Sequence, residues 1–164
     1  MIDALGGRPV GQVGIIVRDL DHALHDYSAR WGLGPWAGYV YGPESVPRLT
    51  YRGGPGNYSV RAALAGWSPQ VELLQPLEGP SIYREWLESG RTGLHHVAVH
   101  VDLLDDAIES MRAASYDVLQ SGQGYGLDGD GGYAYFDTER DFEVIIEAIE
   151  VPKRRREPDF VWPT

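Results

Sequence analysis

Four polar side chains lie in short, largely apolar segments of this chain: Gln12, Glu72, His96 and Glu147. A carboxylate buried in such a segment costs free energy unless it has a partner, and one cation shared by both glutamates would supply it. One imidazole, one carboxamide and two carboxylates suit a divalent ion, so zinc, nickel, cobalt, manganese and magnesium all remain open. We therefore predict that these four residues bind one divalent ion per site.

The expected chemistry at such a site is proton transfer. A metal that polarises a carbonyl makes the adjacent C–H acidic, and a nearby glutamate can then move the proton. Glu147 and Glu72 are the candidate catalytic residues, each acting as a ligand that also shuttles the proton.

The spacing of the four residues follows an internal duplication. Residues 12–24 align with residues 96–108 without a gap, at an offset of 96 − 12 = 84 positions, so the carboxamide and the imidazole take equivalent positions. Each copy is typical of a strand followed by a helix whose start carries aspartate, and each unit ends in an apolar strand with one glutamate. A period this long indicates a duplicated supersecondary unit.

Hydrophobic periodicity and turn residues predict the elements that position these groups. The expected strands are 12–17, 36–41, one starting near residue 49, 58–67, 70–75, 93–101, 118–120, 133–137 and 142–150. The expected helices are 19–31 with Asp19 as its cap, 82–89 with Ser81 as its cap, and 103–114. The glycine-rich segment 120–132 is expected to be a loop, and residues 138–141 a tight turn.

This order predicts two βαβββ modules, 10–76 and 93–150, joined by a connector with a short helix at 77–92. We expect an α+β fold in which the paired modules form one curved, eight-stranded mixed sheet with the helices outside. Residues 1–164 then make a single domain, with 151–164 as a C-terminal tail. The concave face would receive the candidate ligands, because they come from the first and last strand of each module.

Composition excludes several classes of partner. The net charge of −10 argues against nucleic acid, and the absence of cysteine excludes disulfides and thiolate metal sites. The basic run Lys153–Arg156 is expected to be part of a solvated tail, and the alternative is a role in contacting phosphate. No apolar run reaches membrane-spanning length and the N-terminus has no signal-peptide pattern, so we expect a cytoplasmic protein with no membrane partner.

Some residues near the candidate ligands have alternative roles. Gln12 is neutral and an uncommon ligand, so it either coordinates the ion or fills a position where metal binding has decayed. Strand alternation places His95 on the face opposite His96, where it would pack in the core. His100 shares the face of His96 and could contact a substrate. The loop Gly122–Gly132 is a candidate lid, because its glycines allow large backbone changes.

At these residues the sequence resembles the vicinal oxygen chelate superfamily, which includes glyoxalase I, methylmalonyl-CoA epimerase, extradiol dioxygenases and bleomycin-resistance proteins. The resemblance covers about residues 10–150, and four pieces carry it in order: Gln12-Val-Gly-Ile-Ile-Val-Arg-Asp-Leu-Asp, Val71-Glu-Leu-Leu-Gln-Pro, Gly93-Leu-His-His-Val-Ala and Val144-Ile-Ile-Glu. It implies the paired βαβββ fold, a metal site at the four residues above, and assembly as a homodimer.

Two branches of that superfamily are similar to this chain. The Pro-Leu turn, short helix and Gly-Leu-His-His-Val-Ala of Pro76–Ala98 resemble methylmalonyl-CoA epimerase, which implies proton abstraction beside a metal-bound thioester carbonyl and return on the other face. That group differs at two of the four metal positions, the first of which is usually histidine. The quartet itself looks like that of glyoxalase I, which isomerises a glutathione hemithioacetal. The glutathione-binding arginine expected in that enzyme is Ile16 here.

The resemblance therefore implies a metal-dependent isomerase or epimerase, or a glyoxalase-type lyase. Its substrate would be an acyl-CoA thioester, a hemithioacetal or a similar carbonyl compound. An extradiol dioxygenase is disfavoured, because it needs two histidines and one carboxylate on iron and Gln12 breaks that triad. The alternative is a metal-free small-molecule binding protein of the bleomycin-resistance type, in which Glu72, His96 and Glu147 would need another explanation.

Overall fold

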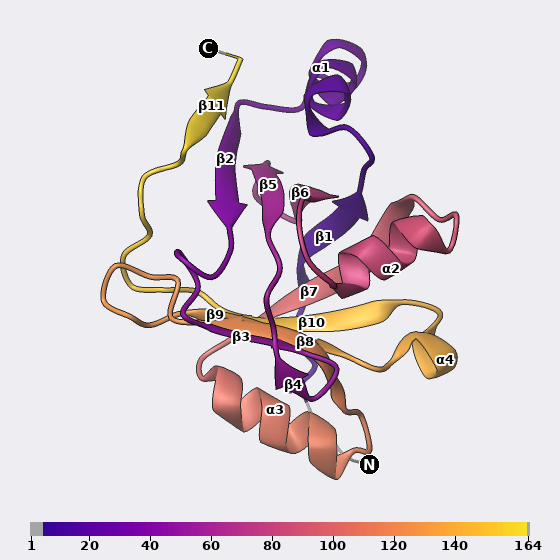
Figure 1. Ribbon diagram of the computed structural model, residues 1–164, viewed down its shortest axis with the longest axis vertical. Coiled ribbons are helices and arrows are strands. Elements are labelled where there is room, and N and C mark those ends of the chain that lie inside the picture. Colours follow the sequence, from indigo (N-terminus) through magenta and orange to yellow (C-terminus); the bar gives the residue numbers. More distant parts are fainter. Residues whose placement is uncertain (1–4, 164) are drawn as a thin grey trace.

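The chain folds into one mixed sheet with helices packed around it, in a computed structural model that describes residues 5–163 (Figure 1). The strands are β1 (Val10–Ile16), β2 (Trp36–Tyr41), β3 (Arg48–Tyr51), β4 (Gly54–Pro55), β5 (Val60–Ala65), β6 (Gln70–Pro76), β7 (Gly93–Val101), β8 (Val118–Gln123), β9 (Gly132–Phe136), β10 (Ile145–Glu150) and β11 (Phe160–Trp162). The helices are α1 (Leu20–Trp31), α2 (Ile82–Glu88), α3 (Leu104–Ala113) and α4 (Glu139–Phe142). The strand order is β11-β2-β5-β6-β1-β7-β10-β9-β8-β3-β4.

Eight of these strands form the two paired modules that the sequence predicts. β1, β2, β5 and β6 with α1 make the first module, and β7 to β10 with α3 make the second. The antiparallel β1–β7 pair joins them, and we call this pair the seam. The α+β class is confirmed, but the described sheet has 11 strands rather than eight. β11 adds to β2 at one edge, and β3 leaves its own module to pair with β8 at the other.

Polar caps and apolar stripes explain the helices beside the sheet. The Asp19 carboxylate accepts a hydrogen bond from the His22 N–H at 3.0 Å, and Gly32 ends α1 in the left-handed conformation with φ 73°. α1 buries Leu20 against one half of the sheet, and α3 buries Leu104 against the other half. The two helices lie at opposite ends of the molecule (Figure 1). Within residues 5–163, no helix is long and apolar enough to cross a membrane.

Three local predictions need correction. β8 runs on to Gln123, because Gly122 lets the Tyr133 ring of β9 pack directly over the strand: a Cβ there would lie 2.6 Å from that ring. The expected loop is therefore shorter and occupies residues 124–131. The expected turn at 138–141 is the short helix α4, and the last long strand starts at Ile145 rather than at residue 142.

The C-terminal segment is not a free tail. β11 pairs with β2, and Gly38 of β2 leaves room for the Phe160 ring of β11. Before β11, the Leu127 N–H donates to the Arg154 carbonyl at 3.0 Å, which ties residues 151–156 to the loop between β8 and β9. Lys153, Arg154 and Arg155 are exposed, as expected, but the segment is held in place by contacts with residues far away in the chain.

Two matching irregularities interrupt the seam. Gln12 pairs with Ala98 and Gly14 with His96, and the register shifts once on each side of this central region. The shifts leave one extra residue in each strand: Gly11 in β1 and His95 in β7. These β-bulges are 84 positions apart, the offset of the duplication. A bulge breaks strand alternation, so the prediction that His95 faces away from His96 is wrong.

Candidate metal centre

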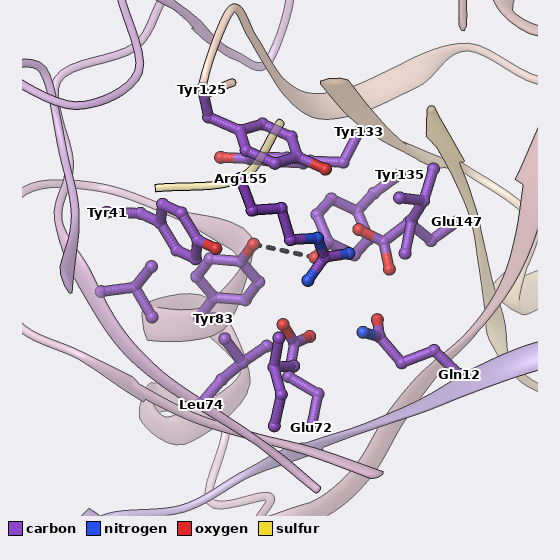
Figure 2. A pocket seen from close by; sticks show the side chains of 13 residues that line it. Gln12, Tyr41, Glu72, Leu74, Tyr83, Tyr125, Tyr133, Tyr135, Glu147 and Arg155 are labelled. Carbon is purple, nitrogen blue, oxygen red and sulfur yellow. Dashed lines mark hydrogen bonds between the residues drawn. The ribbon is translucent and has the colours of Figure 1, made fainter. Parts of the chain in front are cut away.

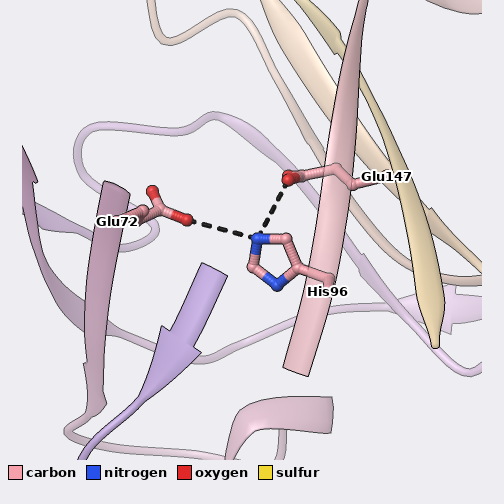
Figure 3. A group of neighbouring side chains, drawn as sticks. All are labelled: Glu72, His96 and Glu147. Carbon is pink, nitrogen blue, oxygen red and sulfur yellow. Dashed lines mark ion pairs between the residues drawn. The ribbon is translucent and has the colours of Figure 1, made fainter. Parts of the chain in front are cut away.

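The sheet brings three of the four candidate ligands to one point. Glu72 comes from β6, His96 from β7 and Glu147 from β10, three strands close together in the sheet order. His96 Nε2 lies 3.4 Å from Glu72 Oε2 and 3.2 Å from Glu147 Oε2 (Figure 3). One ligand atom from each residue lies within 4.8 Å of the others, a spacing that a single metal ion can bridge.

Gln12 of β1 lines the same cavity as the two glutamates. Its Nε2 donates a hydrogen bond to Gln70 Oε1 at 3.0 Å, while its Oε1 is buried without a hydrogen-bond partner. An amide held in this way presents its oxygen, which is the atom that a divalent cation binds. Gln70, which orients Gln12, was not among the predicted site residues, although it lies two positions before Glu72 on β6 and so on the same face.

Buried polar atoms without hydrogen-bond partners gather at this centre. Among the described residues they include Gln12 Oε1, His96 Nε2 and Glu147 Oε2. Buried polar groups are nearly always satisfied, and each one left without a partner costs about 1–3 kcal/mol. Three such atoms beside the Glu72 carboxylate fit a bound cation, and their mixture of oxygen and imidazole nitrogen fits a divalent one.

Two small residues on the seam make room for the candidate ligands. A Cβ added at Gly14 would lie 1.8 Å from the His96 ring, so any larger residue there would displace the imidazole. The duplication relates the Gly14–His96 pair to the Ala98–Gln12 pair, since 14 + 84 = 98 and 12 + 84 = 96. Gly14 thus faces the His96 ring, and Ala98 faces the slimmer amide of Gln12.

His95 supports His96 and is buried in the core, as predicted. Its Nδ1 lies 2.9 Å from His96 Nδ1, and its ring packs against Trp86 with centroids 4.8 Å apart. Burial, and then the charges of His96 and Arg91, lower the pKa of His95 well below its usual value, so its ring is neutral. A neutral His95 accepts a hydrogen bond from the His96 Nδ1–H, which leaves His96 Nε2 directed at the glutamates.

Protonation balances the charge of the centre when no metal is bound. Burial acts to lower the pKa of His96, but Glu147 and Glu72 outweigh it and raise the pKa to about 9. Burial also raises the pKa of Glu147, and the neighbouring His96 opposes that rise. At neutral pH the imidazole is therefore a buried cation between carboxylates, and a metal ion would replace its Nε2 proton.

The centre opens into an inner cavity of about 50 Å³ (Figure 2). The aromatic residues that line it are all tyrosines: Tyr41, Tyr83, Tyr125, Tyr133 and Tyr135. Tyr83 Oη donates to Tyr135 Oη at 2.9 Å, and the Tyr135 hydroxyl in turn acts to lower the pKa of Glu147. The cavity can therefore hold a small polar group whose oxygen accepts a tyrosine hydrogen bond, away from bulk water.

An outer groove of about 610 Å³ lies beside the inner cavity, and Leu64 and Arg155 line both. His100 is exposed and lines this groove rather than the inner cavity. The ring of His100 lies over the bulge residue Gly11, where a Cβ would come within 2.8 Å of it.

From the sequence, Arg155 is only part of the basic run, and it is not predicted to reach the candidate metal centre. Its side chain points into the inner cavity from the C-terminal segment (Figure 2). The residue belongs to a run of four basic residues with no hydrophobic pattern, so no local signal identifies it.

The sequence matches the family model described as the glyoxalase/bleomycin resistance protein/dioxygenase superfamily over residues 11–136. Similar solved structures include methylmalonyl-CoA epimerase from Mycobacterium tuberculosis, with 22% identity and a TM-score of 0.64 over 88% of this chain and 89% of that one. A methylmalonyl-CoA epimerase variant from Streptomyces coelicolor, in complex with 2-nitronate-propionyl-CoA, has 18% identity and a TM-score of 0.66 over 91% and 98% of the two chains.

A hypothetical protein from Bacillus halodurans C-125 also shares the fold, with 18% identity and a TM-score of 0.66 over 92% of this chain and 99% of that one. No curated protein matches the sequence significantly. At these identities the structural likeness shows the fold alone. The family match spans more than half of the chain, and this protein therefore belongs to the glyoxalase/bleomycin resistance protein/dioxygenase superfamily.

Proposed function

We propose that this protein is a metal-dependent isomerase or epimerase that transfers a proton on the carbon next to a metal-bound carbonyl. The observation that carries the proposal is the convergence of three buried atoms without hydrogen-bond partners, from Gln12, His96 and Glu147, beside Glu72. These four residues would hold the ion, which when bound would polarise the carbonyl and acidify the neighbouring C–H. A glyoxalase-type lyase uses the same proton transfer and falls within the proposal.

Glu147 is the proposed base. Burial raises its pKa, so its carboxylate accepts a proton more readily than an exposed glutamate does. Glu72 reaches the centre from the other module, so the two carboxylates approach from different sides (Figure 3). In an epimerase, one would take the proton from one face of the carbon and the other would return it to the opposite face.

The proposed substrate is a small carbonyl compound, such as an acyl-CoA thioester or a hemithioacetal. The inner cavity holds only a small group, and the outer groove is large enough for the remainder of such a molecule. One similar structure contains 2-nitronate-propionyl-CoA, which supports an acyl-CoA for this chain. Assembly as a homodimer stays a prediction, which light scattering of the purified protein tests directly.

Metal content tests the site. Elemental analysis of protein purified without chelator should find one divalent ion per chain, and His96→Ala should lose it. The matched control is His100→Ala, which removes an exposed histidine from the same strand and should retain the ion. A wild-type protein that takes up no ion, even from zinc, nickel, cobalt, manganese or magnesium, would leave the metal-free binding protein as the better proposal.

Proton exchange tests the chemistry. Wild-type protein should catalyse deuterium uptake from D₂O by acyl-CoA or hemithioacetal probes, measured by mass spectrometry. Glu147→Gln should keep the fold but reduce exchange by about 10²–10⁴-fold, because the amide cannot accept the proton. Glu143→Gln, at an exposed position before β10, is the control and should exchange as wild type does. Undiminished exchange in Glu147→Gln would exclude this residue as the base.

A further inference from the structure

The C-terminal segment holds a cation that forms no ion pair with any described residue, although two carboxylates line the same cavity. On one side Arg154 forms an ion pair with Asp128, and on the other Arg156 pairs with Asp159 at 2.7 Å. Arg155, between them, forms no ion pair with any residue of 5–163, although its neighbours in sequence both do. It lines the inner cavity of the candidate metal centre instead.

Two anchors fix the backbone on either side of Arg155. Before it, the Arg154 carbonyl accepts a hydrogen bond from the Leu127 N–H at 3.0 Å. After it, the Arg156 guanidinium donates to the Val40 carbonyl at 2.7 Å, and β11 then pairs with β2. The segment therefore crosses from the second module to the first, and residue 155 lies where it passes the cavity.

Tyrosine rings share the inner cavity with Arg155, beside the carboxylates of Glu72 and Glu147. Tyr41 and Tyr125 pack edge to face with centroids 5.9 Å apart, and both line the inner cavity. Burial raises the pKa of both tyrosines, and the charge of Arg155 opposes that rise in each. Aromatic faces can hold a guanidinium without neutralising it, so its N–H donors stay available to a ligand.

We propose that Arg155 is a specificity-determining residue that binds a carboxylate of the substrate. A guanidinium binds a carboxylate through two parallel N–H···O bonds, which gives both affinity and orientation. Arg155 lines both the outer groove and the inner cavity of about 50 Å³, and on the inner side, beside Glu72 and Glu147, it would hold that carboxylate close to the reacting carbon. The substrate class is then a carbonyl compound with a carboxylate one or two carbons from the carbonyl.

Residue 155 lies beyond residues 11–136, which match the family model. The position of the carbonyl rests on the proposed function, but the anion site does not. The two ideas can therefore fail separately, and the experiment is designed to separate them.

The test compares malonate with malonamide, which has the same carbon skeleton without the charges, by calorimetry on manganese-loaded protein. Wild type should prefer malonate, and in Arg155→Gln the ratio of the two affinities should fall by about tenfold or more. Arg155→Lys should lose part of the preference, because an ammonium keeps the charge but lacks the planar fork. Lys153→Gln removes the same charge from a side chain of the same exposed segment that lines neither the inner cavity nor the outer groove, and it should keep the ratio.

The proposal would be overturned if Arg155→Gln kept the wild-type ratio of affinities. It would also be overturned if the ratio fell as far in Lys153→Gln as in Arg155→Gln. The thermal unfolding midpoint should not change in Arg155→Gln, since this side chain makes no ion pair within residues 5–163, and a lowered midpoint would indicate a structural role instead. Manganese content, measured on the same samples, tests the metal centre separately. A malonate preference that depends on Arg155 in protein that takes up no metal would support this inference and count against the proposed function.

Discussion

His96 is the residue whose charge differs most between the metal-free and the metal-bound protein. Burial lowers its pKa, but Glu147 and Glu72 raise it to about 9, above the usual 6.5. A raised pKa means that the protonated centre contributes stability fully below about pH 6.5, and that this contribution is lost as the pH rises through about 9. A metal ion needs the unprotonated Nε2, so metal and proton compete at every pH below that value.

Metal affinity should therefore increase with pH. Between about pH 6.5 and about pH 8.5, the apparent affinity for manganese should rise by up to about tenfold per pH unit, as one proton is released for each ion bound. Calorimetric titrations in buffers of different ionisation enthalpy measure both the affinity and the protons released. An affinity that stays constant over this interval would contradict a protonated His96 in the metal-free centre.

The glycine beside His96 allows a second prediction, about Gln12. Gln12→His alone should gain little metal affinity, because the Ala98 methyl occupies the space that Gly14 leaves open for the His96 ring. The double variant Gln12→His with Ala98→Gly should bind manganese about tenfold more tightly, since imidazole is a better ligand than a carboxamide. Ala98→Gly is the control, and a single Gln12→His protein that binds as tightly as the double variant would refute the steric argument.

At the scale of single residues, the sequence predicts which side chains converge but not how they are oriented. The duplication predicts that Glu72, His96 and Glu147 converge, because equivalent positions in two paired modules meet at the centre of the sheet. Gln70 and Arg155 could not be found in this way, since a hydrogen bond orients one amide and distant aspartates fix the path of the C-terminal segment.

At the scale of elements, the two bulges of the seam aim the ligands. Each extra residue, Gly11 or His95, directly precedes a candidate ligand. The bulge breaks the strand alternation that would otherwise decide which face of the sheet the ligand side chain points to. Strand alternation predicts the face of an unbroken strand, so it could not predict that His95 and His96 contact each other. The strands and helices themselves follow well from periodicity, except where a segment pairs outside its own module, as β3 and β11 do.

The loop between β8 and β9 remains a candidate lid. It contributes Tyr125 to the inner cavity, and an ion pair between Asp128 and Arg154 ties it to the C-terminal segment. Amide hydrogen exchange of residues 124–131 should slow when manganese and malonate bind, while exchange in α3 should not change. Asp128→Asn should speed amide exchange of the loop in the ligand-free protein, because it removes the ion pair with Arg154. Unchanged exchange of the loop on binding would rule out the lid.

At the scale of the whole molecule, the sheet ends in very short strands at both edges. β11 has three residues and β4 has two, and they lie at opposite ends of the strand order. Short edge strands resist pairing with the sheet of another chain. A homodimer made by extending the sheet is therefore disfavoured, and any dimer of this chain should use the faces of the sheet or its helices.

The route of the C-terminal segment has a consequence for how this protein can change during evolution. The same stretch covers the edge of β2, which would otherwise invite aggregation, and carries Arg155 to the cavity. A substitution that loosens the stretch would alter solubility and ligand preference together. Selection for a new substrate through this segment is therefore constrained by the need to keep the sheet edge covered, whereas the tyrosine wall of the cavity can vary without exposing that edge.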